Sequence, residues 1–307
     1  MDGTAELRKQ VSLIICTVDR LADLERCLES VRPFAAAVGE IIVVNNGSYL
    51  AAVEEIANPH HARVVTEPRR GVSRARNTGI RNALGNIIVF LDDDAQARED
   101  WLHRLIAPLT DSSVDGAMGA VRAQDPAEPW QQAFEQILSQ GLPDGPTMLD
   151  AHAACDPFPL RIAMSGFTMN AAFRRDVFER FGYFDERFGR GTRIGSGEDP
   201  DLFFNVLRLG GRIFFEPRAV VVHRWPTSPN ALRRSMLQSG CAHTAILTKY
   251  FLQEPSLRRA IVRYAASRLR PRPAPRASSK TKIKVPRFSL FLGSLYGPMA
   301  FLLSRKK

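Results

Sequence analysis

The sequence predicts an α/β fold in which a mostly parallel central sheet is flanked by helices. Two observations carry this prediction: short apolar runs alternate with segments of helical periodicity through residues 11–91, and polar side chains directly follow several of these runs. Strands buried on both faces read as continuous apolar runs, and their alternation with helices is typical of a parallel sheet. Ligands bind such sheets at the carboxyl ends of the strands.

Each element in the first third of the chain follows from a local pattern. Residues 11–16 form an aliphatic run that predicts a strand, and the next segment repeats apolar residues at helical spacing. The same pair of patterns returns twice before a fourth apolar run. The predicted strands cover residues 11–16, 40–44, 63–65 and 87–91, and the predicted helices between them cover residues 21–31, 50–56 and 74–84.

The second half of the chain is less regular. Residues 111–165 contain six prolines, which interrupt any long element, and we interpret this segment as a variable insertion. Residues 212–215 and 219–222 predict two short strands on either side of Glu216-Pro217-Arg218. A stretch rich in proline, arginine and serine over residues 270–280 predicts an exposed linker.

Composition excludes several classes of protein. The 307 residues are 45% hydrophobic and 24% charged, which is typical of a globular chain and not of a disordered one. The four cysteines are scattered without a CxxC pair, so neither a zinc site nor a disulfide framework is indicated, and a reducing cytosol is expected. We identify no secretory signal at the N-terminus and no apolar run long enough for a spanning helix.

The net charge of +10 is unevenly divided. Residues 217–307 hold 19 lysines and arginines and a single acid, Glu254, so this part carries +18 and residues 1–216 carry −8. The first two-thirds of the chain is therefore mildly acidic. The last third offers a basic surface to phosphate-rich or lipid partners.

Three consecutive aspartates, Asp92, Asp93 and Asp94, directly follow the apolar run of residues 87–91. Adjacent carboxylates repel one another unless solvent, protons or a metal compensates them, and clustered oxygen ligands suit hard ions such as Mg²⁺ or Mn²⁺. The alternative is that Asp94 or a neighbour caps a helix that begins near Arg98. The triplet alone leaves both interpretations open.

Eight motifs in order resemble those of the inverting family 2 glycosyltransferases, which have the GT-A fold. The resemblance covers roughly residues 10–225. Four motifs match that family's nucleotide-binding half and four its acceptor half: VSLIICT (11–17), IIVVNNGS (41–48), GVSRARNTG (71–79) and FLDDD (90–94), then GFTMNAAFRR (166–175), GYFDE (182–186), GED (197–199) and His223. Each motif is weak by itself, but the ordered set is specific.

The resemblance implies a division of the chain. Residues 1–228 would form a GT-A catalytic domain, with a Rossmann-like half that binds the nucleotide sugar over residues 10–110 and an acceptor and catalytic half over residues 111–228. Residues 229–307 would form a basic, partly amphipathic helical extension.

The resemblance also assigns roles to individual residues. The aspartate cluster is that family's DxD motif, which makes Asp92 a contact to the ribose and Asp94 a ligand of the Mg²⁺ or Mn²⁺ that bridges the diphosphate. His223 is a second candidate metal ligand. Asp199 is the candidate general base, with Glu198 orienting it or binding the acceptor. The other residues expected to bind the nucleotide sugar are Thr17, Asn45, Asn46, Arg76, Asn77, Asp93 and Asn170.

Structural alternatives stand beside these roles. Glu198 and Asp199 precede a helical pattern, where acids are favoured by the helix dipole. A lone histidine such as His223 is often structural, and the alternative for Arg76 is the solvated face of an ordinary helix. Asn45 departs from the family pattern, which commonly has an aspartate that accepts a hydrogen bond from uracil or thymine, so UDP-, dTDP- and GDP-sugars all remain candidate donors.

The basic extension contains two segments of helical periodicity, residues 231–252 and 257–270, and a mostly apolar stretch over residues 288–303. Basic amphipathic helices bind anionic lipid, which predicts peripheral contact with the inner face of the plasma membrane. The alternative is that these helices pack on the catalytic body. Nucleic-acid binding is not expected, because no aromatic platform or reader motif accompanies the charge.

Together these observations predict a cytoplasmic, metal-dependent, inverting glycosyltransferase that moves a sugar from a nucleoside-diphosphate donor to a hydroxyl of a glycan, glycolipid or other acceptor. A role in cell-surface glycan or glycolipid biosynthesis is expected. One alternative is a non-catalytic protein of the same fold that binds nucleotide sugar or phospholipid. Another is a sugar nucleotidylyltransferase, although residues 16–20 lack the glycines of its usual phosphate loop.

Overall fold

The computed structural model describes residues 10–139, 142–150, 167–269 and 286–304. Its centre is a nine-stranded sheet with the order β3-β2-β1-β4-β8-β6-β9-β5, and β7 pairs with β9. The strands are β1 (Val11–Thr17), β2 (Glu40–Asn45), β3 (Arg63–Thr66), β4 (Ile87–Asp92), β5 (Ala95–Ala97), β6 (Gly116–Ala123), β7 (Thr147–Leu149), β8 (Asn170–Arg174) and β9 (Ile213–His223). This architecture confirms the predicted α/β fold.

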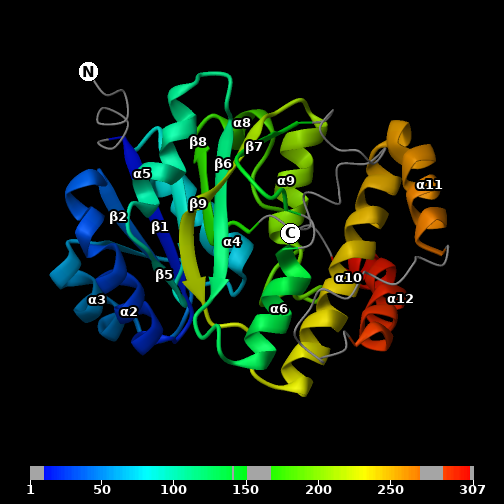
Figure 1. Cartoon of the computed structure of the whole chain (residues 1–307), viewed down its shortest axis with the longest axis horizontal. Coiled ribbons are helices and arrows are strands. Elements are labelled where there is room, and N and C mark those ends of the chain that lie inside the picture. The colour runs from blue at the N-terminus through cyan, green and yellow to red at the C-terminus, as the bar shows by residue number, and fades with distance from the viewer. Residues whose placement is uncertain (1–9, 140–141, 151–166, 270–285, 305–307) are drawn as a thin grey trace.

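The α-helices cover the faces and one end of this sheet (Figure 1). They are α2 (Leu21–Val31), α3 (Leu50–Ala57), α4 (Val72–Asn82), α5 (Trp101–Ile106), α6 (Pro129–Ser139), α8 (Val177–Arg180), α9 (Glu198–Arg208), α10 (Pro229–Gln253), α11 (Arg258–Leu269) and α12 (Arg287–Leu303). Figure 1 shows α10, α11 and α12 grouped at the opposite end of the molecule from α2 and α3.

The first four long strands are parallel, as the alternation of patterns predicts. β1 pairs with β2 and with β4, and β2 pairs with β3, all in parallel register. Their aliphatic side chains, such as Ile14, Val43 and Val89, are fully or almost fully buried. Because the strands are parallel, the polar residues that follow β1, β2 and β4 lie at one edge of the sheet.

The second half of the chain joins the same sheet, which corrects the interpretation of residues 111–165 as a variable insertion. Within that segment β6 is an inner strand, antiparallel to β8 and parallel to β9. β8 in turn pairs antiparallel with β4, so one continuous sheet connects the two halves. The prediction for residues 151–166 and for the linker over 270–280 lies outside the described residues.

The two short strands predicted over residues 212–222 are one strand, β9. Its pairing with β6 shifts in register: Gly119 lies opposite Glu216, whereas Ala120 lies opposite Val220. Three residues of β9 therefore have no counterpart on β6, and Pro217 occupies this gap, where no ladder hydrogen bond from its nitrogen is needed.

The helix-cap interpretation of Asp94 is wrong. The next helix, α5, begins at Trp101 after Asp100, and Asp94 instead precedes the short strand β5. The carboxylate cluster therefore has no capping role.

The C-terminal helices share a hydrophobic core with the rest of the molecule. Ala245 and Tyr250 of α10, Tyr264 of α11 and Phe301 of α12 belong to the same buried cluster as Phe204 of α9. Among the described residues, no helix combines the length and the apolar character that a membrane span needs.

Candidate active site

A cavity of about 840 Å³ lies at the carboxyl ends of β1 and β4 and the end of β9. The start of α4, the first turn of α9 and one face of α10 complete its walls. The charged side chains that line it are Arg20, Arg70, Arg76, Asp92, Asp93, Asp94, Arg190, Glu198, Asp199, His223, Arg224 and Arg234. The aspartate triplet and the downstream acids are therefore brought to one site from opposite halves of the chain.

Arg76 connects the two groups of acids. Its Nη2 donates to Asp92 Oδ1 at 3.0 Å, and its Nη1 donates to Asp199 Oδ1 at 2.8 Å and to Glu198 Oε1 at 3.1 Å. The guanidinium is 2% exposed and lies over the Phe184 ring, 5.5 Å from its centroid. The alternative of a solvated arginine on a helix face is therefore wrong, and one buried cation faces three carboxylates.

Asp199 is buried in the first turn of α9. Its Oδ1 also accepts a short hydrogen bond from Thr168 Oγ1, and both residues are buried. Burial raises the pKa of Asp199, although Arg76 and Thr168 oppose that rise by binding the carboxylate. A carboxylate held in a fixed direction, with a raised pKa, is suited to accept a proton from a bound hydroxyl.

Glu198 gives the site a measurable dependence on pH. Burial raises the pKa of Glu198 from 4.5 to about 7; the charge of Asp199 adds to that rise and Arg76 opposes it. Between these pH values Glu198 binds more protons in the folded protein than in the unfolded chain, so its contribution to stability is expected to fall as the pH rises from 4.5 to about 7.

Glu198→Gln should remove this contribution, so the variant should lose less stability than the wild type between about pH 5 and about pH 8. Urea unfolding at both pH values measures the difference. Glu99→Gln, which changes an exposed glutamate, is the matched control and should follow the wild type. If Glu198→Gln also followed the wild type, the raised pKa of Glu198 would be refuted.

Asp93 and Asp94 are held by Arg20, which follows β1. Arg20 Nη1 lies 3.2 Å from Asp93 Oδ1 and also binds Asp94 Oδ2, while Thr17 Oγ1 donates to Asp93 Oδ2 at 2.8 Å. Burial raises the pKa of Asp93 to about 7 in spite of Arg20. Burial acts in the same direction on Asp94, but the hydrogen bond and charge of His223 and nearby arginines hold its pKa well below the usual range. Asp94 is therefore the more readily ionised of the two carboxyl groups.

The pair of Asp94 and His223 fits a divalent cation. His223 Nε2 lies 3.1 Å from Asp94 Oδ1, and both side chains line the cavity. These two atoms are joined here by the hydrogen bond that lowers the pKa of Asp94, and a cation held by both side chains would replace that bond. Among the described residues, no three histidine, cysteine, aspartate or glutamate side chains are placed so that together they could hold one metal ion. A cation at this pair would therefore complete its coordination with phosphate oxygens and water, as Mg²⁺ commonly does.

Comparison with known proteins identifies the family. Residues 12–182 match the model of "Glycosyl transferase family 2", which is more than half of the chain. The chain belongs to glycosyl transferase family 2. It is a glycosyltransferase, as the ordered motifs predict.

Two curated relatives align with most of this glycosyltransferase. It is 28% identical over 251 residues to the succinoglycan biosynthesis protein ExoM of Rhizobium meliloti (strain 1021), an alignment that covers 78% of this chain and 75% of ExoM. It is 26% identical over 222 residues to the pre-mycofactocin glycosyltransferase of Mycobacterium tuberculosis (strain H37Rv). That second alignment covers 70% of this chain but only 43% of the relative.

Solved structures confirm the GT-A fold. The mannosyltransferase PcManGT from Pyrobaculum calidifontis, in complex with GDP-Man and Mn²⁺, superposes with a TM-score of 0.60 at 20% identity, over 97% of this chain and 76% of that chain. The glucosyl-3-phosphoglycerate synthase from Mycobacterium tuberculosis, in complex with Mn²⁺, UDP and glucosyl-3-phosphoglycerate, gives 0.53 at 20% identity, over 80% and 82% of the two chains.

The prediction that Asn170 binds the nucleotide sugar is contradicted by its surroundings. In this glycosyltransferase Asn170 is fully buried, and its Nδ2 donates to the carbonyls of Ala120 and Ala219 at 2.8 and 2.9 Å. Its Oδ1 accepts from Trp101 Nε1 at 2.8 Å. All three of these hydrogen bonds are made to other parts of the protein core, so the amide of Asn170 does not face the cavity.

Three other predicted asparagines shape the site from behind or at its edge. Asn77 is buried and exchanges two hydrogen bonds with the backbone of Phe184, at 2.9 and 3.0 Å, and it is not part of the cavity lining. Asn45 is buried, and its Oδ1 accepts from the Gly47 amide at 3.1 Å. Asn46 lines the cavity and binds backbone groups of residues 67–71. Thr17 acts on the site through Asp93.

Several residues that line the cavity or bind its acids escaped prediction. Arg20 binds two of the aspartates, and Thr168 binds the candidate base, although Thr168 lies inside a recognised motif. Arg190 and Arg234 are exposed arginines on the cavity lining. Trp225 also lines the cavity, with its ring centroid 4.4 Å from that of His223 and its indole N–H buried without a partner among the described residues. No local pattern distinguishes these residues from ordinary surface or core residues.

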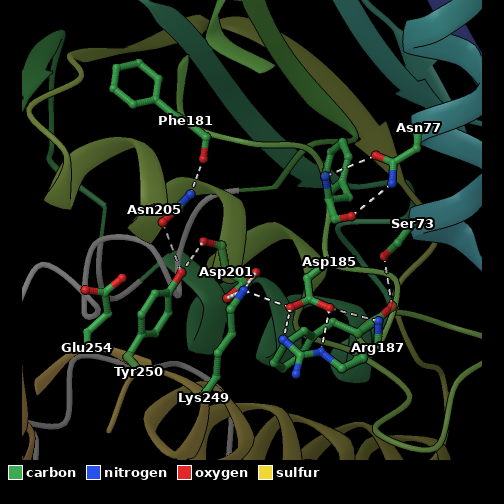
Figure 2. A network of polar contacts seen from close by, with 12 residues as sticks. Ser73, Asn77, Phe181, Asp185, Arg187, Asp201, Asn205, Lys249, Tyr250 and Glu254 are labelled. Carbon is green, nitrogen blue, oxygen red and sulfur yellow. Dashed lines mark hydrogen bonds and ion pairs between the residues drawn. The ribbon is translucent and has the colours of Figure 1, made fainter. Parts of the chain in front are cut away.

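A buried ionic network ties α10 to the helix that carries the candidate base (Figure 2). Lys249 Nζ lies 2.6 Å from Asp201 Oδ2 and 3.0 Å from Asp185 Oδ2, and Arg187 Nε donates to Asp185 Oδ1 at 2.8 Å. Asp201 lies in the same turn of α9 as Asp199. The C-terminal helices therefore form part of the scaffold that positions the active site.

Proposed function

We propose that this glycosyltransferase moves a sugar from a nucleoside-diphosphate donor to an acceptor hydroxyl in a single inverting displacement. The observation that carries the proposal is that acids from two parts of the chain share one cavity. Asp92–Asp94 lie on one side, Asp199 lies on the other, and Arg76 lies between them. Asp199 removes the proton of the acceptor hydroxyl as that oxygen attacks the anomeric carbon. Glu198, beside it on the cavity wall, orients the acceptor.

The donor side is assigned to Asp94 and His223. These two residues would hold Mg²⁺ or Mn²⁺, and the bound ion would neutralise charge that develops on the leaving diphosphate. Asp92 binds the ribose, and Arg20 and Arg190 supply further positive charge next to Asp94. The GDP-Man and Mn²⁺ of one structural neighbour and the UDP and Mn²⁺ of another support a donor of this class.

The acceptor is proposed to be a cell-surface glycan or glycolipid precursor, which the name of the relative ExoM supports. We assign the chemistry to residues 1–228 and treat residues 229–307 as an extension that supplies a wall of the cavity through Arg234 and Gln238. The base of the donor stays open, because Asn45 is buried against Gly47 and does not face the cavity.

The metal assignment predicts a specific thermal-shift result. One of UDP, GDP and dTDP should raise the melting temperature of the wild type in the presence of Mn²⁺ and much less in its absence, because the cation joins the diphosphate to Asp94. Asp94→Asn and His223→Ala should both lose the part of the shift that depends on Mn²⁺. His103→Ala, on α5 and outside the cavity lining, is the matched control. A metal-independent shift, or none with any nucleotide, would contradict the assignment.

A further inference from the structure

Helix α12 exposes its large apolar residues, which is the reverse of an ordinary surface helix. Leu295 is 63% exposed and Leu302 is 65% exposed. The residues that face outward recur every three or four positions along the helix, singly or as adjacent pairs: Phe288, Phe291 with Leu292, Leu295, Met299, and Leu302 with Leu303. They form one continuous stripe, which we call the α12 face.

The inner side of α12 carries small residues because its backbone touches α10. A Cβ added at Gly293 would lie 1.9 Å from the Leu237 carbonyl oxygen, and one added at Gly297 would lie 2.1 Å from Thr244 Oγ1. Thr244 Oγ1 also donates to the carbonyl of Ser294 at 2.8 Å. This contact leaves no space for side chains at the two glycines, so most of the large residues of α12 lie on the outer side, while Phe301 is buried in the core.

The charges around the α12 face are positive. Residues 288–303 contain no charged side chain, and Arg287 begins the helix. On α10 and α11, which are grouped with α12 at one end of the molecule (Figure 1), the exposed arginines outside the cavity lining are Arg233, Arg258, Arg259 and Arg263. The acid of this region, Glu254, is paired with Arg208 at 3.3 Å. A partner that covers the α12 face must therefore be apolar at its centre and negatively charged at its edge.

We propose that the α12 face docks on an anionic lipid bilayer, with α12 lying in the plane of the interface. An interfacial helix buries one apolar face at the boundary between headgroups and acyl chains, and arginines beside it attract anionic headgroups. A helix of this length, about 25 Å at 1.5 Å per residue, lies along the surface without crossing it. A second copy of the chain fits less well, because its own arginines would face those of the first.

This docking would bring the cavity close to the membrane. α10 separates the two: Ser235, Gln238 and Ser239 line the cavity, while Leu237 and Gly240 contact α12. This step rests on the function proposed above. The acceptor would then be an amphiphile held in the bilayer, and its hydroxyl would reach Asp199 across the width of α10.

Vesicle flotation with the full chain tests the docking. The wild type should float with vesicles that contain phosphatidylglycerol and far less with phosphatidylcholine alone. Leu295→Glu with Leu302→Glu should reduce flotation at least tenfold, because two carboxylates enter the α12 face. The matched control places the same two charges at Leu84 and Leu209, which are 80% and 48% exposed on the catalytic body, and should float like the wild type.

Three measurements besides flotation keep the outcomes distinct: circular dichroism, light scattering and the nucleotide-dependent thermal shift. Circular dichroism melting shows whether each variant is folded. Failure of the wild type to float, or equal flotation of both double variants, would overturn the proposal. If light scattering showed a wild-type dimer, and if Leu295→Glu with Leu302→Glu made the protein monomeric, the α12 face would instead bind a second copy of the chain, and the proposal would be overturned. Flotation without any nucleotide-dependent thermal shift would leave the docking intact and refute the proposed function.

Discussion

Asp199→Asn is expected to lower the rate of sugar transfer by roughly 10²- to 10⁴-fold, the usual contribution of a general base. The amide keeps the shape of the side chain and still accepts hydrogen bonds from Arg76 and Thr168, so the cavity should hold its form. An amide does not take up the proton of the acceptor hydroxyl. Release of nucleoside diphosphate, followed with a donor of the base found in the thermal-shift screen, measures the effect.

Nucleotide binding separates a lost base from a damaged site. Titration calorimetry should give Asp199→Asn and the wild type the same affinity for the nucleotide, because the proposed mechanism places Asp199 on the acceptor side. Asp100→Asn makes the same chemical change at a residue whose side chain is 68% exposed, and it should leave both properties unchanged. Transfer at the wild-type rate by Asp199→Asn would remove this residue from the mechanism.

Arg76→Met is expected to destabilise the protein by about 3–5 kcal/mol, the cost of leaving buried charges without their partner. In the wild type one guanidinium, 2% exposed, neutralises part of the charge of Asp92, Glu198 and Asp199. Methionine fills much of the same volume but offers no charge and no donor. Denaturation in urea at neutral pH measures the loss as a shift of the midpoint.

Arg81→Met is the matched control, because Arg81 lies on the same helix and its guanidinium stacks on Tyr183 at the surface. Its effect should stay within the range of ordinary surface changes, about 0.5 kcal/mol. A loss below about 1 kcal/mol for Arg76→Met would mean that the three acids are neutral or hydrated in the folded state. Arg76 would then no longer be the centre of the site.

The parallel part of the fold was predictable because its strands are buried on both faces. β1, β2 and β4 read as uninterrupted aliphatic runs, and their predicted limits agree with the structure to within one residue at each end. β6 was missed for a physical reason: it packs so closely that two positions must be glycine. A Cβ at Gly116 would lie 2.6 Å from the Phe173 ring, and one at Gly119 would lie 2.1 Å from the Ala219 carbonyl. Such a strand has no aliphatic signal.

The site was predictable in its acids and in some of their partners, such as Arg76, but not in all of them. The aspartate triplet, Glu198–Asp199 and His223 stand in motifs, and the fold brings them to one cavity. Arg20 and Thr168 bind those acids across long stretches of chain, so nothing local marks them. Asn170 was assigned from its motif, but in the structure its amide is hydrogen-bonded within the core.

The register shift in β9 decides which face of the sheet His223 points to, because the number of extra residues in β9 is odd. Ile213 and Phe215, before the shift, belong to the core cluster on one face of the sheet, whereas Ala219 and Val221, after it, belong to the cluster on the other face. Alternating residues of an unbroken strand stay on one face, so an insertion of an odd number of residues reverses the alternation. The segment between Glu216 and Val220 is therefore constrained in its length more than in its composition. Deleting a single residue from it would turn His223 away from Asp94, whereas replacing a side chain there would not.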